Sequence, residues 1–149
     1  MIKKLFTYTI FLLILFTKFL NAEEKFLSLK KDTVNVRYNP SFDSEIKYVY
    51  KKINLPVKQI DEKENFRRIV DLKNNSGWIH VSQLKKANSI IVLKNKILFT
   101  KASTFSKPIA RLEKGRLLII IKCEKSWCNI TTENYKGWII AENFWGTIK

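Results

Sequence analysis

Gly77-Trp78-Ile79 recurs as Gly137-Trp138-Ile139, sixty positions further along a chain of 149 residues. The segments before the two copies also correspond, because Phe66-Arg67-Arg68-Ile69 precedes the first and Trp127-Cys128-Asn129-Ile130 precedes the second at an offset of 61. Offsets that differ only slightly, with the extra residues located in turns, indicate a duplicated unit of roughly 60 residues. The sequence therefore predicts two tandem modules, which we place at residues 26–86 and 89–149.

Short runs rich in β-branched and aromatic residues follow residue 24, and no long segment has apolar residues at helical spacing. Many short strands separated by turn residues are typical of small barrels or sandwiches. We therefore expect an all-β fold, with the polar stretch 85–89 as a linker between the modules. The expected strands are residues 34–36, 46–50, 55–60, 66–70, 77–81, 90–93, 97–99, 109–112, 117–123, 127–131 and 137–140.

Residues 1–22 have the pattern of a secretory signal peptide. A positive head at 1–4 precedes an apolar core at 5–16, and Ala22 stands before two glutamates. That apolar core is short for a transmembrane span. We expect export to the periplasm or the extracellular space, with cleavage after Ala22. An uncleaved N-terminal anchor is the alternative, because Leu20 occupies a position where a small residue is usual.

The net charge is strongly positive, with 28 Lys+Arg against 13 Asp+Glu. Removing the three lysines of residues 1–22 leaves a formal charge of +12. Such a charge invites a nucleic-acid interpretation. However, only five of the basic residues are arginine, the residue that makes bidentate phosphate and guanine contacts, and the lysines are scattered. We expect a solvated surface attracted to anionic envelope polymers and lipid headgroups, and no nucleic-acid partner.

Cys123 and Cys128 are the only cysteines. They flank a stretch that predicts a tight hairpin, and a disulfide is the expected state of two cysteines in an exported chain. A redox pair and a metal site are the alternatives, although a metal would require more ligands than two thiols and one histidine.

His80 is the only histidine, and it follows the first Gly-Trp-Ile. Strand alternation places it half-exposed, with no nucleophile and orienting group beside it. The acidic residues Asp61, Glu62 and Glu64 precede Phe66, where a solvated hairpin loop is expected. We therefore expect no catalytic residue, no metal and no cofactor.

Taken in order, these motifs resemble the bacterial SH3-like domain, and residues 26–149 resemble small exported proteins with two such domains. The first repeat carries Val34-Asn35-Val36-Arg37 followed by Pro40, then Leu55-Pro56-Val57 and Gly77-Trp78-Ile79-His80. The second repeat ends with Cys123 to Cys128, Gly137-Trp138-Ile139 and Phe144-Trp145-Gly146. The resemblance implies two small SH3-like β-barrels.

Two interpretations of the tryptophans stay open. Trp78 and Trp138 are large enough to fill the small core of each module. Alternatively, as the resemblance implies, they line an aromatic groove that binds peptide. The groove residues would be Tyr38, Phe66, Trp78, Trp127 and Trp138.

The resemblance implies a non-enzymatic binding protein of the cell envelope whose ligand is a cell-wall peptide or an envelope protein. Two other functions compete with this hypothesis. One is a structural module in which Trp127, Phe144 and Trp145 pack the repeats on each other or on a partner. The other is a redox protein that uses the cysteine pair.

Overall fold

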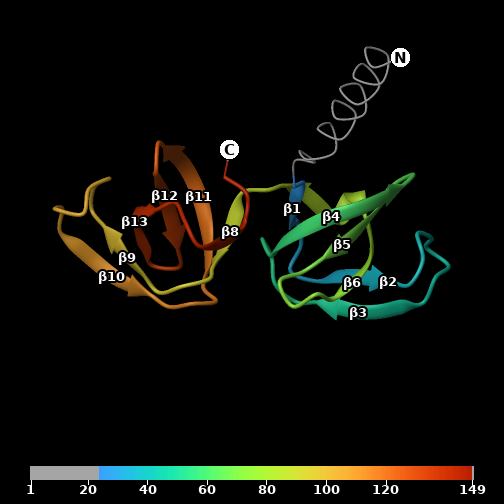
Figure 1. The fold of residues 1–149 in the computed structure, drawn as a ribbon. Coiled ribbons are helices and arrows are strands. Elements are labelled where there is room, and N and C mark those ends of the chain that lie inside the picture. Colours follow the sequence, from blue (N-terminus) through green and yellow to red (C-terminus); the bar gives the residue numbers. More distant parts are fainter. Residues whose placement is uncertain (1–23, 149) are drawn as a thin grey trace, which may run out of the picture.

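The computed structural model describes residues 24–148, and the expected signal peptide at residues 1–22 lies outside them. The described chain is all-β, with two seven-stranded antiparallel sheets and one short 3-10 helix. Figure 1 shows the sheets as two similar modules side by side. The expected all-β fold of two tandem modules is confirmed. Within residues 24–148, no helix has the length and apolar character needed to cross a membrane.

The strands of the first module have the order β3-β2-β6-β5-β4-β1-β7. Their bounds are β1 Phe26–Leu29, β2 Val34–Arg37, β3 Ile46–Tyr50, β4 Pro56–Lys63, β5 Phe66–Val70, β6 Ser76–His80 and β7 Leu84–Lys86, with the 3-10 helix η2 at Val81–Gln83. The second module has the order β10-β9-β13-β12-β11-β8-β14, which repeats the first order strand for strand. Its bounds are β8 Ser89–Val92, β9 Lys96–Phe99, β10 Pro108–Leu112, β11 Leu117–Glu124, β12 Trp127–Thr132, β13 Tyr135–Ile140 and β14 Phe144–Gly146. The duplication predicted from the sequence thus extends to every strand.

Each module has its own aliphatic core. Buried side chains from alternate strand positions fill it, because successive side chains of a strand point to opposite faces. The first core contains Leu29, Val34, Val36, Val57, Ile69, Ile79 and Leu84, and the second contains Ile90, Val92, Leu98, Leu112, Leu118, Cys128, Ile130 and Ile139.

The interpretation of Trp78 and Trp138 as core residues is wrong. Ile79 and Ile139 are the fully buried members of the two Gly-Trp-Ile motifs, and both tryptophans are only half-buried. The reason is the alternation of the strand, which turns the indole to the opposite face from its isoleucine neighbour. The tryptophans therefore lie on the outer face of each sheet.

The glycines before the tryptophans allow two strands to approach closely. A Cβ on Gly77 would collide with Val36 Cγ1 and lie 3.0 Å from the carbonyl oxygen of Arg37. A Cβ on Gly137 would lie 2.6 Å from the carbonyl oxygen of Phe99. Any larger residue at these two positions would therefore push the neighbouring strand away.

The expected linker at 85–89 is too long. β7 continues to Lys86 and β8 begins at Ser89, so only residues 87 and 88 separate the two sheets. Ser89 is fully buried, and its Oγ lies 2.8 Å from the Oγ of the equally buried Ser28. The polar sequence here reflects a hydrogen-bonded contact between modules, because buried polar groups are stable when they have partners.

The two modules pack on each other in the middle of Figure 1, where β8 and β14 of the second module meet β1 and β4 of the first. Phe26 meets the ring of Trp145 edge to face, with ring centroids 5.1 Å apart. The indole Nε1 of Trp145 donates a hydrogen bond to the carbonyl oxygen of Pro56 across the boundary, at 3.1 Å. Of the three residues expected to pack the repeats together, Trp145 does so. Trp127 packs instead on Phe99 within the second module, with ring centroids 5.8 Å apart.

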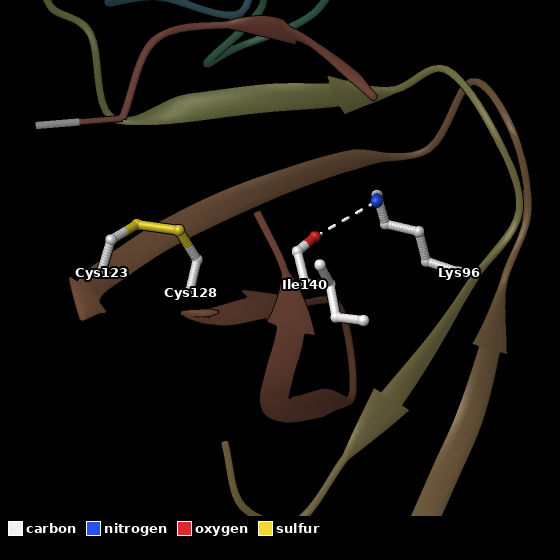
Figure 2. The surroundings of a disulfide bond; sticks show 4 residues. All are labelled: Lys96, Cys123, Cys128 and Ile140. Atoms are coloured by element: carbon white, nitrogen blue, oxygen red, sulfur yellow. Dashed lines mark hydrogen bonds between the residues drawn. A yellow bond between two sulfur atoms is a disulfide. The ribbon is translucent and has the colours of Figure 1, made fainter. Parts of the chain in front are cut away.

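The cysteines form a disulfide, which confirms the sequence prediction. Cys123 and Cys128 lie directly opposite each other on β11 and β12, with Cα atoms 4.1 Å apart. Figure 2 shows this bond near Ile140, whose carbonyl oxygen accepts a hydrogen bond from Lys96 Nζ at 3.1 Å. Burial lowers the pKa of Lys96, and the nearby Glu142 opposes that shift. The disulfide fixes one end of a hairpin that contributes Leu118, Cys128 and Ile130 to the second core.

Candidate binding surface

The outer face of β2, β6 and β5 in the first module brings cations beside an indole. Trp78 on β6 is directly opposite Arg37 on β2 and Arg68 on β5. Cross-strand partners on one face of a sheet lie about 5 Å apart at Cβ. The pairing therefore makes a row of Arg37, Trp78 and Arg68 across three strands.

An open pocket of about 290 Å³ lies over this row. Its lining residues come from four strands and the loop after β2, and they are Arg37, Tyr38, Asn39, Lys47, Arg68, Ser76, Gly77 and Trp78. Three of them are cations and none is an acid. The ion pairs among residues 24–148 involve none of these cations. The pocket therefore carries an uncompensated positive charge.

Backbone carbonyls hold two of the three cations in place. Arg37 donates from Nη1 to the carbonyl oxygen of Ser44, at 2.5 Å, and Lys47 donates from Nζ to the carbonyl oxygen of Ser76, at 2.9 Å. Each contact uses one donor of a group that has several, since a guanidinium has five N–H donors and an ammonium three. The remaining donors are available to a ligand.

An aromatic cluster adjoins the pocket on the same face. Phe42, in the loop between β2 and β3, packs on Phe66 and His80 with ring centroids 5.3 and 4.7 Å away. Phe66 and His80 are cross-strand partners, and their ring centroids lie 5.1 Å apart. Phe66 is 5% exposed, whereas Phe42 is 63% exposed. Phe42 is therefore the ring that this cluster presents to solvent.

Tyr38 continues the surface at the edge of the pocket. Its side chain is 56% exposed, and Lys47 Nζ lies 5.5 Å from the centre of its ring. Arg37 makes a similar contact with Phe42, at 5.9 Å from the ring centre. Such cation–π contacts add modest attraction at exposed sites. Cations and rings thus alternate across this face, which can hold a ligand through charge and through flat apolar contact.

The corresponding face of the second module is different. Trp138 has Phe99 and Asn129 as its cross-strand partners, where Trp78 has two arginines. Lys122 Nζ lies 5.4 Å above the Trp138 ring. Phe105, in the loop between β9 and β10, is 100% exposed and belongs to no aromatic pair among the described residues. The two modules therefore share a fold but present different surfaces.

The predicted groove residues do not form one continuous site. Tyr38, Phe66 and Trp78 lie on the first module, while Trp127 and Trp138 lie on the second. Figure 1 shows that the β2–β3 and β9–β10 loops extend at opposite ends of the molecule. The structure thus offers two separate aromatic faces.

Sequence reasoning missed the residues that give the first face its character. Arg37 and Arg68 stand in quoted motifs, but their position beside Trp78 follows from strand register, which no local pattern reveals. Phe42 follows a turn, and only the folded loop brings it onto Phe66. In the sequence, the signals that could have pointed to this face are the segment Arg37-Tyr38-Asn39-Pro40 and the arginine pair at 67–68.

The expected acidic hairpin loop is also shorter than predicted. β4 continues to Lys63, so Asp61 and Glu62 lie within a strand. Glu62 forms ion pairs with Arg67, at 3.4 Å, and Lys25, at 3.9 Å. This acidic cluster therefore belongs to the surface of β4 and β5.

His80 lies half-exposed, as strand alternation predicts, and its Nδ1 is 2.8 Å from Ser82 Oγ. Within residues 24–148 no group of three or more His, Cys, Asp or Glu side chains could hold a metal ion. The first face thus combines hydrogen-bond donors with aromatic rings.

Comparison with known proteins identifies the family of both modules. Residues 30–86 and 94–146 each match the family described as Bacterial SH3 domain. No curated protein matches the chain. Two solved structures from Trichomonas vaginalis are similar: NlpC2, at 13% identity and a TM-score of 0.38, and NlpC1, at 11% and 0.39. Both alignments cover 84% of this chain, but 49% of NlpC2 and 46% of NlpC1, so the chain spans about half the length of each.

Proposed function

Since the chain belongs to the bacterial SH3 domain family, we propose that it is an exported, non-enzymatic binding protein of the cell envelope whose ligand is a cell-wall peptide. The observation that carries this proposal is the outer face of the first module, defined by Arg37, Tyr38, Phe42, Arg68 and Trp78 and named here the cationic aromatic face. Exposed rings supply contact area, and SH3 domains use aromatic surfaces to hold extended peptides.

Two further observations support an envelope location. The disulfide Cys123–Cys128 is typical of proteins that fold in an oxidising compartment. The excess of basic over acidic residues gives the protein a positive surface, which would be attracted to anionic polymers of the envelope. Long-range attraction would raise the rate of encounter, and the cationic aromatic face would supply specificity.

Co-sedimentation with purified wall sacculi tests this proposal. We expect the mature protein to sediment with sacculi at low salt, and Phe42→Ala to lower the retained fraction several-fold because it removes the exposed ring of the face. Phe105→Ala is the matched control, since it removes an exposed phenylalanine from the corresponding loop of the second module and should leave retention unchanged.

Two outcomes would count against the proposal. If the wild-type protein stays in the supernatant at low salt, wall binding is refuted. Retention of an envelope protein in a pull-down would then favour a protein partner. If Phe42→Ala and Phe105→Ala bind equally well, the retention is a property of the overall charge and the cationic aromatic face is not the site.

A further inference from the structure

We infer that the pocket over Trp78 is a binding site for the free carboxylate of a peptide, with Arg37 and Arg68 as the groups that receive it. This inference rests on the proposed function and specifies which part of the ligand the first module recognises.

The placement of the two arginines carries the inference. They lie on either side of Trp78 in one cross-strand row and both line the pocket. Neighbouring strands are about 4.8 Å apart, so the row spans about 10 Å at the backbone, and long side chains can converge over the indole. A guanidinium presents two parallel N–H donors that match the two oxygens of a carboxylate.

The charge of the pocket is arranged before any ligand arrives. Arg37 and Lys47 are each anchored by one backbone carbonyl, which limits their freedom while leaving other donors unused. Asp61 is the cross-strand neighbour of Arg68 on β4, but no ion pair joins the two. An incoming anion would therefore meet two anchored cations and Arg68, with no carboxylate of this pocket competing for them.

The floor and size of the pocket favour the end of a peptide. A volume of about 290 Å³ is small for a whole ligand, since pockets for drug-sized molecules begin at about 300 Å³. The lining of the pocket is almost entirely polar, so it suits the charged end of a chain and offers little contact to an apolar side chain. A terminal residue could therefore place its carboxylate on the arginines.

The second module provides a built-in comparison. Trp138 has the same place in its sheet as Trp78, but Phe99 and Asn129 occupy the positions of the two arginines. A carboxylate site that depends on Arg37 and Arg68 should therefore be absent at Trp138. The indole N–H groups of Trp78 and Trp138, two of the four in the chain, can report on both positions in a single spectrum.

The experiment is a ¹⁵N–¹H NMR titration of the intact disulfide-bonded protein with N-acetyl-alanyl-alanine, its C-terminal amide and inorganic phosphate. We expect the free acid to shift the Trp78 indole signal and to leave the Trp138 signal in place, and the amide to shift neither. Arg68→Gln should weaken binding of the free acid about tenfold, because a hydrogen bond to a charged group contributes more than a neutral one. Arg68→Lys should restore part of that loss.

Arg111→Gln is the control for net charge, because Arg111 is exposed on β10 of the second module. It should bind the free acid like the wild type. An unchanged indole and backbone spectrum of Arg68→Gln without ligand shows that this variant is folded.

Three results would overturn the inference. The Trp78 signal could fail to move with the free acid, or move equally with the amide. Phosphate could shift it as strongly as the free acid, which would make the pocket a general anion site. Arg68→Gln and Arg111→Gln could weaken binding equally, which would reduce the effect to overall charge. Failure of the sacculus assay alone would refute the proposed function and leave this titration to decide the carboxylate site.

Discussion

Trp78 and Gly77 show how neighbouring residues divide two tasks. Gly77 has no side chain, and this lets β6 approach Val36 and the backbone of Arg37. Trp78 then projects on the opposite face beside the Arg37 side chain. The Gly-Trp motif could be recognised from the sequence, but the direction of the indole depends on which face of the strand enters the core.

Asp71 is the residue whose ionisation should be visible in stability. Burial raises its pKa, but hydrogen bonds from the Asn75 side chain and backbone, the Tyr50 hydroxyl and the Lys73 backbone outweigh burial and lower it. The Tyr50 hydroxyl lies 3.0 Å from Asp71 Oδ2. The carboxylate therefore stabilises the turn that leads into β6.

We predict a specific pH dependence from this lowered pKa. The contribution of Asp71 is present above the pKa of the unfolded chain, about 3.9, and is lost as pH falls through the lower folded value. Asp71→Asn should therefore be less stable than the wild type at neutral pH, and the difference should shrink below about pH 4. Urea unfolding at a series of pH values measures this difference in the free energy of unfolding, and the exposed Asp43→Asn is the control. A difference that stays constant from pH 7 to pH 3 would contradict the assignment.

At the scale of strands, the sequence predicted most strands of both sheets, including the edge strand β3, and missed three short strands at or next to the opposite edges. Ile46–Tyr50 and Phe66–Val70 were predicted with their observed bounds because β-branched and aromatic residues run through them. β1, β7 and β14 were missed. Each has three or four residues, and β1 and β14 depend on burial between the modules as well as on local pattern.

The disulfide should matter to the β11–β12 hairpin. It links cross-strand neighbours and closes a short loop, for which the chain-entropy argument gives about 2 kcal/mol of stabilisation. We predict that the double variant Cys123→Ala with Cys128→Ala loses about that amount, and more to the extent that it leaves a void at the fully buried Cys128.

Alkylation of the unreduced protein, followed by mass measurement, should find no free thiol, and guanidinium unfolding measures the loss. Two alkylated cysteines in the native protein would contradict the disulfide. A reduction potential far above that of structural disulfides would favour the redox function instead.

At the scale of the whole molecule, the modules are joined by side chains that would face solvent in an isolated module. Along β1, Leu27 and Leu29 contact the first core, and Phe26 and Ser28 alternate with them. Phe26 and Ser28 are nevertheless buried. The second module covers them. No pattern within one repeat could reveal this contact, since it depends on how two folded units meet.

Trp145 should couple the stability of the two modules. Trp145→Ala removes the edge contact with Phe26 and the hydrogen bond to the Pro56 carbonyl. We predict that calorimetry resolves two transitions in this variant where the wild type shows one, with a loss of about 2–3 kcal/mol, below the range for a fully buried aromatic because Trp145 is half-buried. Tyr135→Ala, an exposed aromatic position on β13, is the control. A single transition with unchanged stability would show that the modules do not depend on this contact.

The central claim is that the cationic aromatic face of the first module binds the cell wall. Co-sedimentation of the double variant Phe42→Ala with Arg68→Gln and of the matched Phe105→Ala with Arg111→Gln tests it most directly, since both remove one exposed phenylalanine and one arginine. We predict that the first variant remains in the supernatant and that the second sediments with sacculi like the wild type. Equal sedimentation of the two variants would contradict the claim.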